Sequence, residues 1–245
     1  MPTSALSEQG KSLLLRAARE IEVDLEPTLP RFEQFYRRLV EANATTNLTA
    51  IRDERGIVLK HFVDSLSCLK SGRLEGSLRV LDLGTGAGFP GLPLKLVRPE
   101  LELTFLDATH KKIAFIESIC RELNLSGTQC LWGRAETLGH DPAHREAYDR
   151  VVSRAVSALN TLSELCLPLV KVGGFMIAQK GAGVAEELEQ ARAAIHQLGG
   201  AVRDVVAFKL LGLEEPRALV VVEKTHPTPA RYPRRAGVPA KNPLS

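Results

Sequence analysis

The glycine-rich turn at residues 84–91 restricts the fold of this chain more than any other segment. It reads GTGAGFPG, follows a short apolar run at residues 78–83 and precedes a helical pattern that continues to about Val97. Glycines let the chain reverse within a few residues and let a ligand lie close to the backbone. A strand, a turn of this kind and a helix in succession begin a βα unit, which predicts a parallel sheet.

Strand and helix patterns continue to alternate after this unit. Further strands are expected at residues 101–106, 128–132, 148–153, 174–179, 202–211 and 218–223, and helices at 111–123, 159–170 and 184–198. Only a few residues join the last two strands, which requires an antiparallel pair because a parallel pair needs a long crossover. We therefore predict an α/β fold with a doubly wound, mainly parallel seven-stranded sheet of Rossmann type and one antiparallel strand near an edge.

The first 75 residues have helical patterns instead. Apolar side chains recur every three or four positions in residues 32–40, which predicts one buried face of a helix. A second helical pattern covers residues 54–69. We divide the chain into an N-terminal helical cap region (1–75), an α/β domain (76–225) and a proline-containing C-terminal tail (226–245).

An acidic residue follows the glycine turn at the spacing of a nucleotide site. Asp107 ends the next strand, 19 residues after Gly88, where a carboxylate accepts hydrogen bonds from ribose hydroxyls. The glycine spacing also matches dinucleotide sites, which hold a pyrophosphate at a helix N-terminus. However, Asp82 would repel a pyrophosphate, and Pro90 removes one N–H donor from the helix start. These residues favour S-adenosylmethionine, whose amino and sulfonium groups are cationic.

Two basic residues, Arg154 and Lys180, follow the fourth and fifth strands and predict an acceptor site. The fourth strand is not followed by the Asn/Asp-Pro-Pro-aromatic motif of adenine amine methylation, and Cys166 lies inside an expected helix rather than at a cleft. Guanine N7 has a lone pair and no proton, so its methylation needs positioning but no general base. We expect Arg154 and Lys180 to act as catalytic residues, with Arg154 donating to guanine O6 or to a phosphate. A salt bridge to a neighbouring acid is the alternative for Arg154.

Positive charge is concentrated at the C-terminus. The chain has a formal net charge of +3, but residues 226–245 contain no acidic residue and carry +4, which leaves −1 for the rest. The four basic residues are Arg231, Arg234, Arg235 and Lys241. We expect this tail to contact RNA over a small area at an edge of the cofactor site.

The cysteines and the apolar runs argue against several other classes of protein. The four cysteines are widely spaced, and we expect neither a disulfide framework nor a metal site. The apolar runs are much shorter than the roughly 18 residues of a membrane span. We expect a cytoplasmic, monomeric protein.

These motifs together resemble the bacterial 16S ribosomal RNA guanine-N7 methyltransferases, the RsmG family, formerly called glucose-inhibited division protein B. The resemblance extends from about Phe32 to Leu244. It rests on TNLT (46–49), HFVDS (61–65), DLGTGAGFPG (82–91), VSRA (152–155), QKG (179–181) and the tail sequence RYPRRAGVPAKNPL (231–244). The glycine turn occurs in many methyltransferases, whereas the form with Phe89 and Pro90, the VSRA motif and this tail are specific to the family.

The resemblance implies a class I S-adenosylmethionine-dependent methyltransferase that modifies N7 of one guanine in the decoding-region loop of 16S ribosomal RNA, within the small ribosomal subunit. The product of the cofactor would be S-adenosylhomocysteine, and no metal is implied. Two alternatives stay open: a methyltransferase for another RNA, a protein or a small molecule, and a non-catalytic module that binds S-adenosylmethionine or RNA.

The resemblance also assigns site residues. The expected cofactor contacts, with the turn residues included, are Asp82, Gly84, Thr85, Gly86, Gly88, Phe89, Asp107, Ala108, Thr109, Ala135, Glu136 and Arg154. Arg154 thereby has a cofactor-side role beside its guanine-side role. The N-terminal region would cover the cleft and contact RNA through Asn47, Asp64 and Ser65. Asn47 is equally well explained as a turn residue, and Asp64 as an acid on a helix surface.

Overall fold

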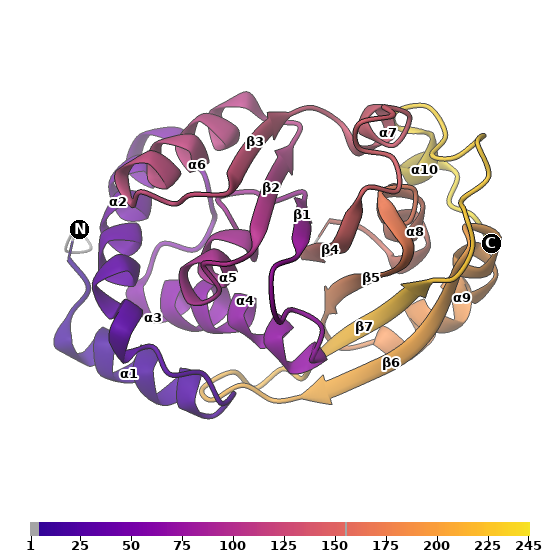
Figure 1. Cartoon of the computed structure of the whole chain (residues 1–245). Helices are drawn as coiled ribbons and strands as arrows, with labels where there is room; N and C mark the ends of the chain where they lie inside the picture. Colours follow the sequence, from indigo (N-terminus) through magenta and orange to yellow (C-terminus); the bar gives the residue numbers. More distant parts are fainter. Residues whose placement is uncertain (1–4, 155) are drawn as a thin grey trace.

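A single twisted sheet forms the centre of the molecule (Figure 1). The computed structural model describes residues 5–154 and 156–245, and in this part of the chain seven strands lie in the order β3-β2-β1-β4-β5-β7-β6. The strands are β1 (Arg79–Leu83), β2 (Glu102–Asp107), β3 (Thr128–Trp132), β4 (Tyr148–Arg154), β5 (Val170–Lys180), β6 (Gly200–Phe208) and β7 (Arg217–Lys224). Strands β1 to β5 pair in parallel, and β7 is antiparallel to both β5 and β6. The predicted sheet is confirmed.

Helices cover both faces of the sheet because alternate strand residues point to opposite sides. Val80, Phe105 and Val152 pack into one hydrophobic cluster, while Leu81, Leu106 and Val151 pack into the other. The helices of this part of the chain are α5 (Gly91–Val97), α6 (His110–Glu122), α7 (Ala135–Leu138), α8 (Leu159–Cys166) and α9 (Val184–Gln197). Both clusters are therefore shielded from water along the length of the strands.

The boundary between α8 and β5 differs from the prediction. The helix ends at Cys166, and β5 begins at Val170, where a helix was expected to end. Val170 pairs with Tyr148 of β4, and both residues are wholly buried. A short apolar run has the same composition in a buried helix and in a buried strand, so periodicity does not separate the two.

The N-terminal helices pack against one face of the sheet. They comprise α1 (Glu8–Arg19), η1 (Glu26–Thr28) and α2 (Leu29–Thr46), followed by the segment α3 (Glu54–Gly56), η2 (Ile57–Val63), α4 (Asp64–Leu66) and η3 (Ser67–Ser71). Phe32, Phe35, Tyr36 and Leu39 of α2 are buried, as the apolar spacing predicts. The division of the chain at residue 75 stays a prediction, since these side chains share one hydrophobic cluster with the sheet.

The predicted helix at residues 54–69 is interrupted by a π-helix, η2. A π-helical turn has more residues than an α-helical turn, so it changes which side chains share a face. His61 and Asp64 both face the end of β4 from this segment, as their contacts with Arg154 show.

The C-terminal tail is docked on the body of the protein rather than extended from it (Figure 1). The Arg145 guanidinium donates hydrogen bonds to the carbonyl oxygens of Gly139, Thr228 and Tyr232 at 2.7–2.8 Å. The short helix α10 (Val238–Lys241) lies against α8, where Thr161 donates to the Pro239 carbonyl. Among the described residues, no helix combines the length and apolar character that crossing a lipid bilayer requires.

Candidate active site

Asp82 stabilises the glycine turn through hydrogen bonds. This carboxylate is wholly buried and accepts hydrogen bonds from the Thr85 hydroxyl at 2.6 Å and the Gly91 N–H at 2.8 Å. Burial raises the pKa of Asp82 to about 7. Asp82 was expected to be a charge beside the ligand, but the structure directs its carboxylate into the turn itself. Its observed contacts therefore support the shape of the turn and not a choice between ligands.

Gly86 and Asp107 meet where β1 and β2 end. Gly86 has a φ of +61°, and a Cβ added there would meet no atom within 4 Å, so the backbone borders open space. Its N–H donates to one Asp107 oxygen at 3.0 Å, and the Thr109 N–H donates to the other at 2.8 Å. An ionised carboxylate has about four acceptor positions. Lys112 forms an ion pair with one of the oxygens at 3.7 Å, beyond hydrogen-bond distance. About two acceptor positions therefore have no hydrogen bond and remain for the hydroxyls of a ligand.

The other predicted cofactor residues surround this point. Ala108 is exposed next to Asp107, and Ala135 begins α7 just beyond the end of β3. Glu136 is half-buried, and its carboxylate accepts a hydrogen bond from the Gly237 N–H of the tail at 3.0 Å. The Phe89 ring is buried, stacked 4.4 Å from the His61 ring, with the Arg154 guanidinium 5.2 Å from its centre. Gly84 and Gly88 occupy left-handed positions within the same turn.

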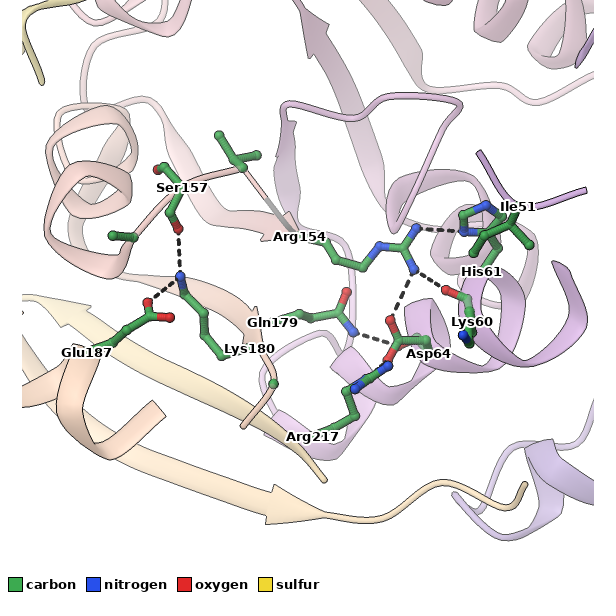
Figure 2. Close-up of a pocket in the computed structure, with 13 residues that line it drawn as sticks. Ile51, Lys60, His61, Asp64, Arg154, Ser157, Gln179, Lys180, Glu187 and Arg217 are labelled. Carbon is green, nitrogen blue, oxygen red and sulfur yellow. Dashed lines mark hydrogen bonds and ion pairs between the residues drawn. The ribbon is translucent and has the colours of Figure 1, made fainter. Parts of the chain in front are cut away.

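A cavity of about 710 Å³ lies beyond the ends of β4 and β5 (Figure 2). Its walls include both predicted catalytic residues, Arg154 and Lys180. It adjoins the glycine turn, because Val156 in its wall lies 2.5 Å from the position that a Gly84 Cβ would take. Ala155, the last residue of the VSRA motif, lies outside the described residues.

Asp64 joins two arginines in this cavity. Its oxygens accept from Arg154 at 3.1 Å and from Arg217 at 3.0 Å, and its side chain is only 9% exposed. Arg154 also donates to the Lys60 carbonyl at 2.6 Å. Two cations on one shielded carboxylate hold both guanidinium groups in fixed orientations. The salt bridge considered as the alternative for Arg154 is therefore present.

His61 is held neutral beside Arg154. Its Nδ1 lies 3.1 Å from the Arg154 guanidinium, and its Nε2 lies 2.8 Å from the Thr49 hydroxyl. A guanidinium only donates, so Nδ1 is the acceptor and Nε2 carries the proton. Burial, together with the charge of Arg154, lowers the pKa of His61 to about 3. His61 therefore fixes the guanidinium without adding a charge.

Lys180 is paired on the other side of the cavity (Figure 2). Its ammonium group donates to the Ser157 carbonyl at 2.7 Å and forms an ion pair with Glu187 at 2.7 Å. Glu187 also accepts from the Leu159 N–H, which begins α8. The acidic partner is thus fixed to the helix start, and Lys180 is held in the wall of the cavity.

The predicted RNA contacts of the N-terminal region fall in different environments. Asn47 is exposed and ends α2 in a left-handed conformation, with its side chain accepting from Arg52 at 2.8 Å. Ser65 is wholly buried, and its hydroxyl donates to the His61 carbonyl. This placement does not support an RNA contact at Ser65. The turn-residue explanation of Asn47 agrees with its position.

The four basic residues of the tail also separate into two kinds. Arg234 forms a fork of hydrogen bonds with Glu164, whose side chain is wholly buried, at distances from 2.6 to 3.2 Å. Arg231, Arg235 and Lys241 are exposed. Arg234 therefore has a structural role that the number of tail charges did not reveal, and three cations face solvent.

Arg217, His61 and Thr49 are site residues that the sequence patterns did not single out. Arg217 begins β7. Because β7 is antiparallel to β5, β7 starts at the end of the sheet where β5 finishes. The strand expected at 218–223 begins one residue after Arg217, so its antiparallel direction held a usable signal for this arginine. His61 and Thr49 lie in the HFVDS and TNLT motifs, but their contact depends on how two separate segments pack.

The sheet order and the site at the ends of β1, β2 and β4 define the fold of the class I S-adenosylmethionine-dependent methyltransferases. The chain resembles TrmN from Thermus thermophilus (TM-score 0.52, 22% identity, 66% of this chain and 48% of that chain). It also resembles a SAM dependent methyltransferase from Aquifex aeolicus (TM-score 0.51, 18% identity, 72% and 97%). At these identities, the likeness shows the fold alone.

The chain belongs to the family described as GidB, rRNA small subunit methyltransferase G, which matches residues 28–214. It is 51% identical over 239 residues to the ribosomal RNA small subunit methyltransferase G of Deinococcus deserti, covering 98% of each chain. The corresponding protein of Deinococcus radiodurans is 50% identical over 244 residues, covering 100% of this chain and 96% of that one. The family resemblance seen in the motifs is confirmed.

Proposed function

We propose that this protein transfers the methyl group of S-adenosylmethionine to N7 of one guanine in the decoding-region loop of 16S ribosomal RNA. The substrate would be the small ribosomal subunit, met in the cytoplasm. Family membership supports methylation of ribosomal RNA as the class of reaction. The choice of atom rests on one observation, which is that every carboxylate and imidazole described in the wall of the cavity already has a protein partner.

The described wall of the cavity contains two carboxylates and one imidazole, the side chains that most often act as general bases. Asp64 is paired with two arginines, Glu187 is paired with Lys180, and His61 uses both ring nitrogens. Among the residues that the structure describes, the cavity thus offers no unpaired carboxylate or imidazole. Guanine N7 carries no proton, so this arrangement suits it better than an exocyclic amine.

The cofactor site is proposed at the glycine turn. Asp107 would accept the ribose hydroxyls, the backbone near Ala135 and the Glu136 carboxylate would contact adenine, and the turn at Gly84–Gly86 would face the methionine part. The open space at Gly86 and the two unused acceptor positions of Asp107 support this fit. When bound, the cofactor supplies an electrophilic methyl group on a positively charged sulfur.

The cations of the cavity retain donors for the acceptor base. A guanidinium has five N–H donors, and Arg154 uses three of them, toward Lys60, Asp64 and His61. An ammonium has three, and Lys180 uses two. Their remaining donors would hold guanine O6 or a phosphate, so that N7 is kept in line with the methyl group.

The proposal is tested by transfer of labelled methyl groups. Purified protein is incubated with methyl-labelled S-adenosylmethionine and small ribosomal subunits from cells that lack this modification, and RNA is then separated from protein. We expect label in 16S ribosomal RNA. Fully modified subunits serve as the control and should take up no label, whereas label in ribosomal proteins would contradict the proposal.

A further inference from the structure

The only tryptophan of the chain, Trp132, is unusually exposed. It is the last residue of β3, one of the two edge strands of the sheet, and 65% of its surface is open to solvent. Trp132 pairs in register with Asp107, so it lies at the same end of the sheet as the proposed cofactor site. Leaving such a large aromatic surface in water forgoes the stabilisation that burial provides. The exposed ring is therefore free to stack on a flat ligand.

The Trp132 ring is held in a defined orientation. Its Nε1–H donates to the Ala108 carbonyl at 3.1 Å, and the His110 ring meets it edge-on, with the ring centres 5.0 Å apart and the planes at 79°. Ala108 directly follows Asp107, the proposed ribose-binding residue, and His110 is the first residue of α6. A ring fixed in this way loses little conformational freedom when a flat ligand stacks on it.

Two cationic side chains lie close in the sequence to the ring or to a residue that contacts it. Lys111 follows His110 at the start of α6, and Arg134 lies two residues beyond Trp132. Both side chains are exposed, and within residues 5–154 and 156–245 neither forms an ion pair. An aromatic face with nearby unpaired cations is the combination that binds unpaired bases and the phosphates next to them.

We propose that Trp132 is a stacking platform for an unpaired base of the ribosomal RNA substrate, with Lys111 and Arg134 contacting the adjoining phosphates. This inference rests on the proposed function and extends its RNA contact to the edge of the sheet at β3. The platform lies beside the cofactor segment and adds to the contacts made by the tail. A base stacked there would hold the RNA on the β3 side of the cofactor site, across β2 and β1 from the acceptor cavity, without taking part in the reaction.

The test uses the full-length protein and an RNA hairpin with the decoding-region loop, compared with a fully paired duplex of equal length. Because Trp132 is the only tryptophan, its fluorescence reports directly on this ring. We expect the hairpin to quench the emission and the duplex to leave it nearly unchanged. Saturating S-adenosylhomocysteine is present throughout, so that cofactor binding does not contribute to the change.

Variants measure what the ring contributes to affinity. Trp132→Ala should weaken hairpin binding roughly tenfold, whereas Trp132→Phe should keep most of the affinity because it retains a flat ring. Val172→Ala is the matched control, since Val172 is also an exposed apolar residue, 49% accessible, at the start of β5. Affinity for S-adenosylmethionine, measured by calorimetry, should stay the same in all three variants.

The outcomes separate the platform from the proposed function. Unchanged hairpin affinity in Trp132→Ala, while the wild-type protein methylates subunits, overturns the platform and leaves the function in place. Loss of cofactor affinity in Trp132→Ala also overturns it, because the ring would then stack on the cofactor. If the wild-type protein does not methylate ribosomal RNA, the proposed function fails and the platform fails with it.

Discussion

At the scale of single residues, most polar side chains of the site position other parts of the protein rather than a ligand. Asp82 shapes the glycine turn, Asp64 orients two arginines, and His61 fixes Arg154 while staying neutral. Asp107 differs from them because it has acceptor positions left over after it has bound the turn. We therefore expect substitutions of Asp107 to act on ligand binding, and substitutions of His61 to act on stability.

Replacing Asp107 should weaken cofactor binding. Each hydrogen bond to a charged group contributes about 1.5–3 kcal/mol, so Asp107→Ala should reduce affinity for S-adenosylmethionine by about 100-fold, as measured by calorimetry. Asp107→Asn retains one acceptor for the Gly86 N–H and should lose less. Glu102→Gln, at an exposed position on the same strand, is the control and should bind normally. Unchanged affinity in Asp107→Ala would remove the ribose-binding role.

His61 should make the protein less stable in acid. Its pKa falls from an ordinary 6.5 to about 3 in the folded chain, so between these values the unfolded chain takes up a proton that the folded chain does not. Stability from this group is present above pH 6.5 and decreases as the pH falls, by about 2 kcal/mol at pH 5. Denaturant unfolding of His61→Gln should show a correspondingly smaller loss between pH 7 and 5.

The comparison between variant and wild type removes an opposite effect. The pKa of Asp82 is raised from 3.8 to about 7, so this group favours the folded state as the pH falls through that range. Asp82 is present in both proteins, and its effect cancels in the difference. His226→Gln, at an exposed histidine, is the control. Parallel stability curves for wild type and His61→Gln would contradict the assigned environment of His61.

At the scale of elements, part of the tail is bound to the body of the protein and part of it is exposed to solvent. Arg234 and Gly237 attach it to α8 and α7, through Glu164 and Glu136 respectively. The hydrogen bond to Glu136 places the tail next to the proposed adenine site. Arg231, Arg235 and Lys241 remain exposed.

Arg234 and Arg235 are neighbours with different expected effects. Arg234→Ala leaves the buried Glu164 without its partner and should lower the free energy of unfolding by about 3 kcal/mol. Arg235→Ala should change stability by less than about 0.5 kcal/mol. Instead, it should weaken RNA binding and reduce the slope of log affinity against log salt by about 0.7–0.9 for each phosphate that Arg235 neutralises. Equal stability losses in the two variants, or an unchanged salt slope in Arg235→Ala, would contradict this division.

The elements of the fold were more predictable from the sequence than the directions of side chains. Regular spacing places strands and helices, so the seven strands, their mainly parallel arrangement and the antiparallel β7 were accessible. Whether Asp82 faces a ligand or its own turn, and whether Arg234 is free or paired, depends on how the folded segments pack. Ser65 shows the same limit, because a hydroxyl in a motif has no direction until the helix that carries it is packed.

At the scale of the whole molecule, the proposed cofactor and acceptor residues lie together at the end of the sheet where the parallel strands finish. The glycine turn, Asp107, Arg154 and Lys180 all lie where parallel strands end, and Arg217 joins them because β7 runs the other way. The docked tail reaches the same end of the sheet, where the Gly237 N–H donates to Glu136. A protein with a net charge of only +3 can therefore present its free cations where the RNA is expected to lie.

The identity of the methylated nucleoside tests the proposed function most directly. After transfer to unmodified small subunits, 16S ribosomal RNA is digested to nucleosides, and the labelled product is identified by chromatography and mass spectrometry. A cavity whose described carboxylates and imidazole are all paired predicts N7-methylguanosine, formed at a single position of the decoding-region loop. A label on an exocyclic amine or on a pyrimidine carbon would contradict the proposed function. The first reaction needs a general base and the second a nucleophile, and the described wall of this cavity holds neither an unpaired carboxylate or imidazole nor a cysteine.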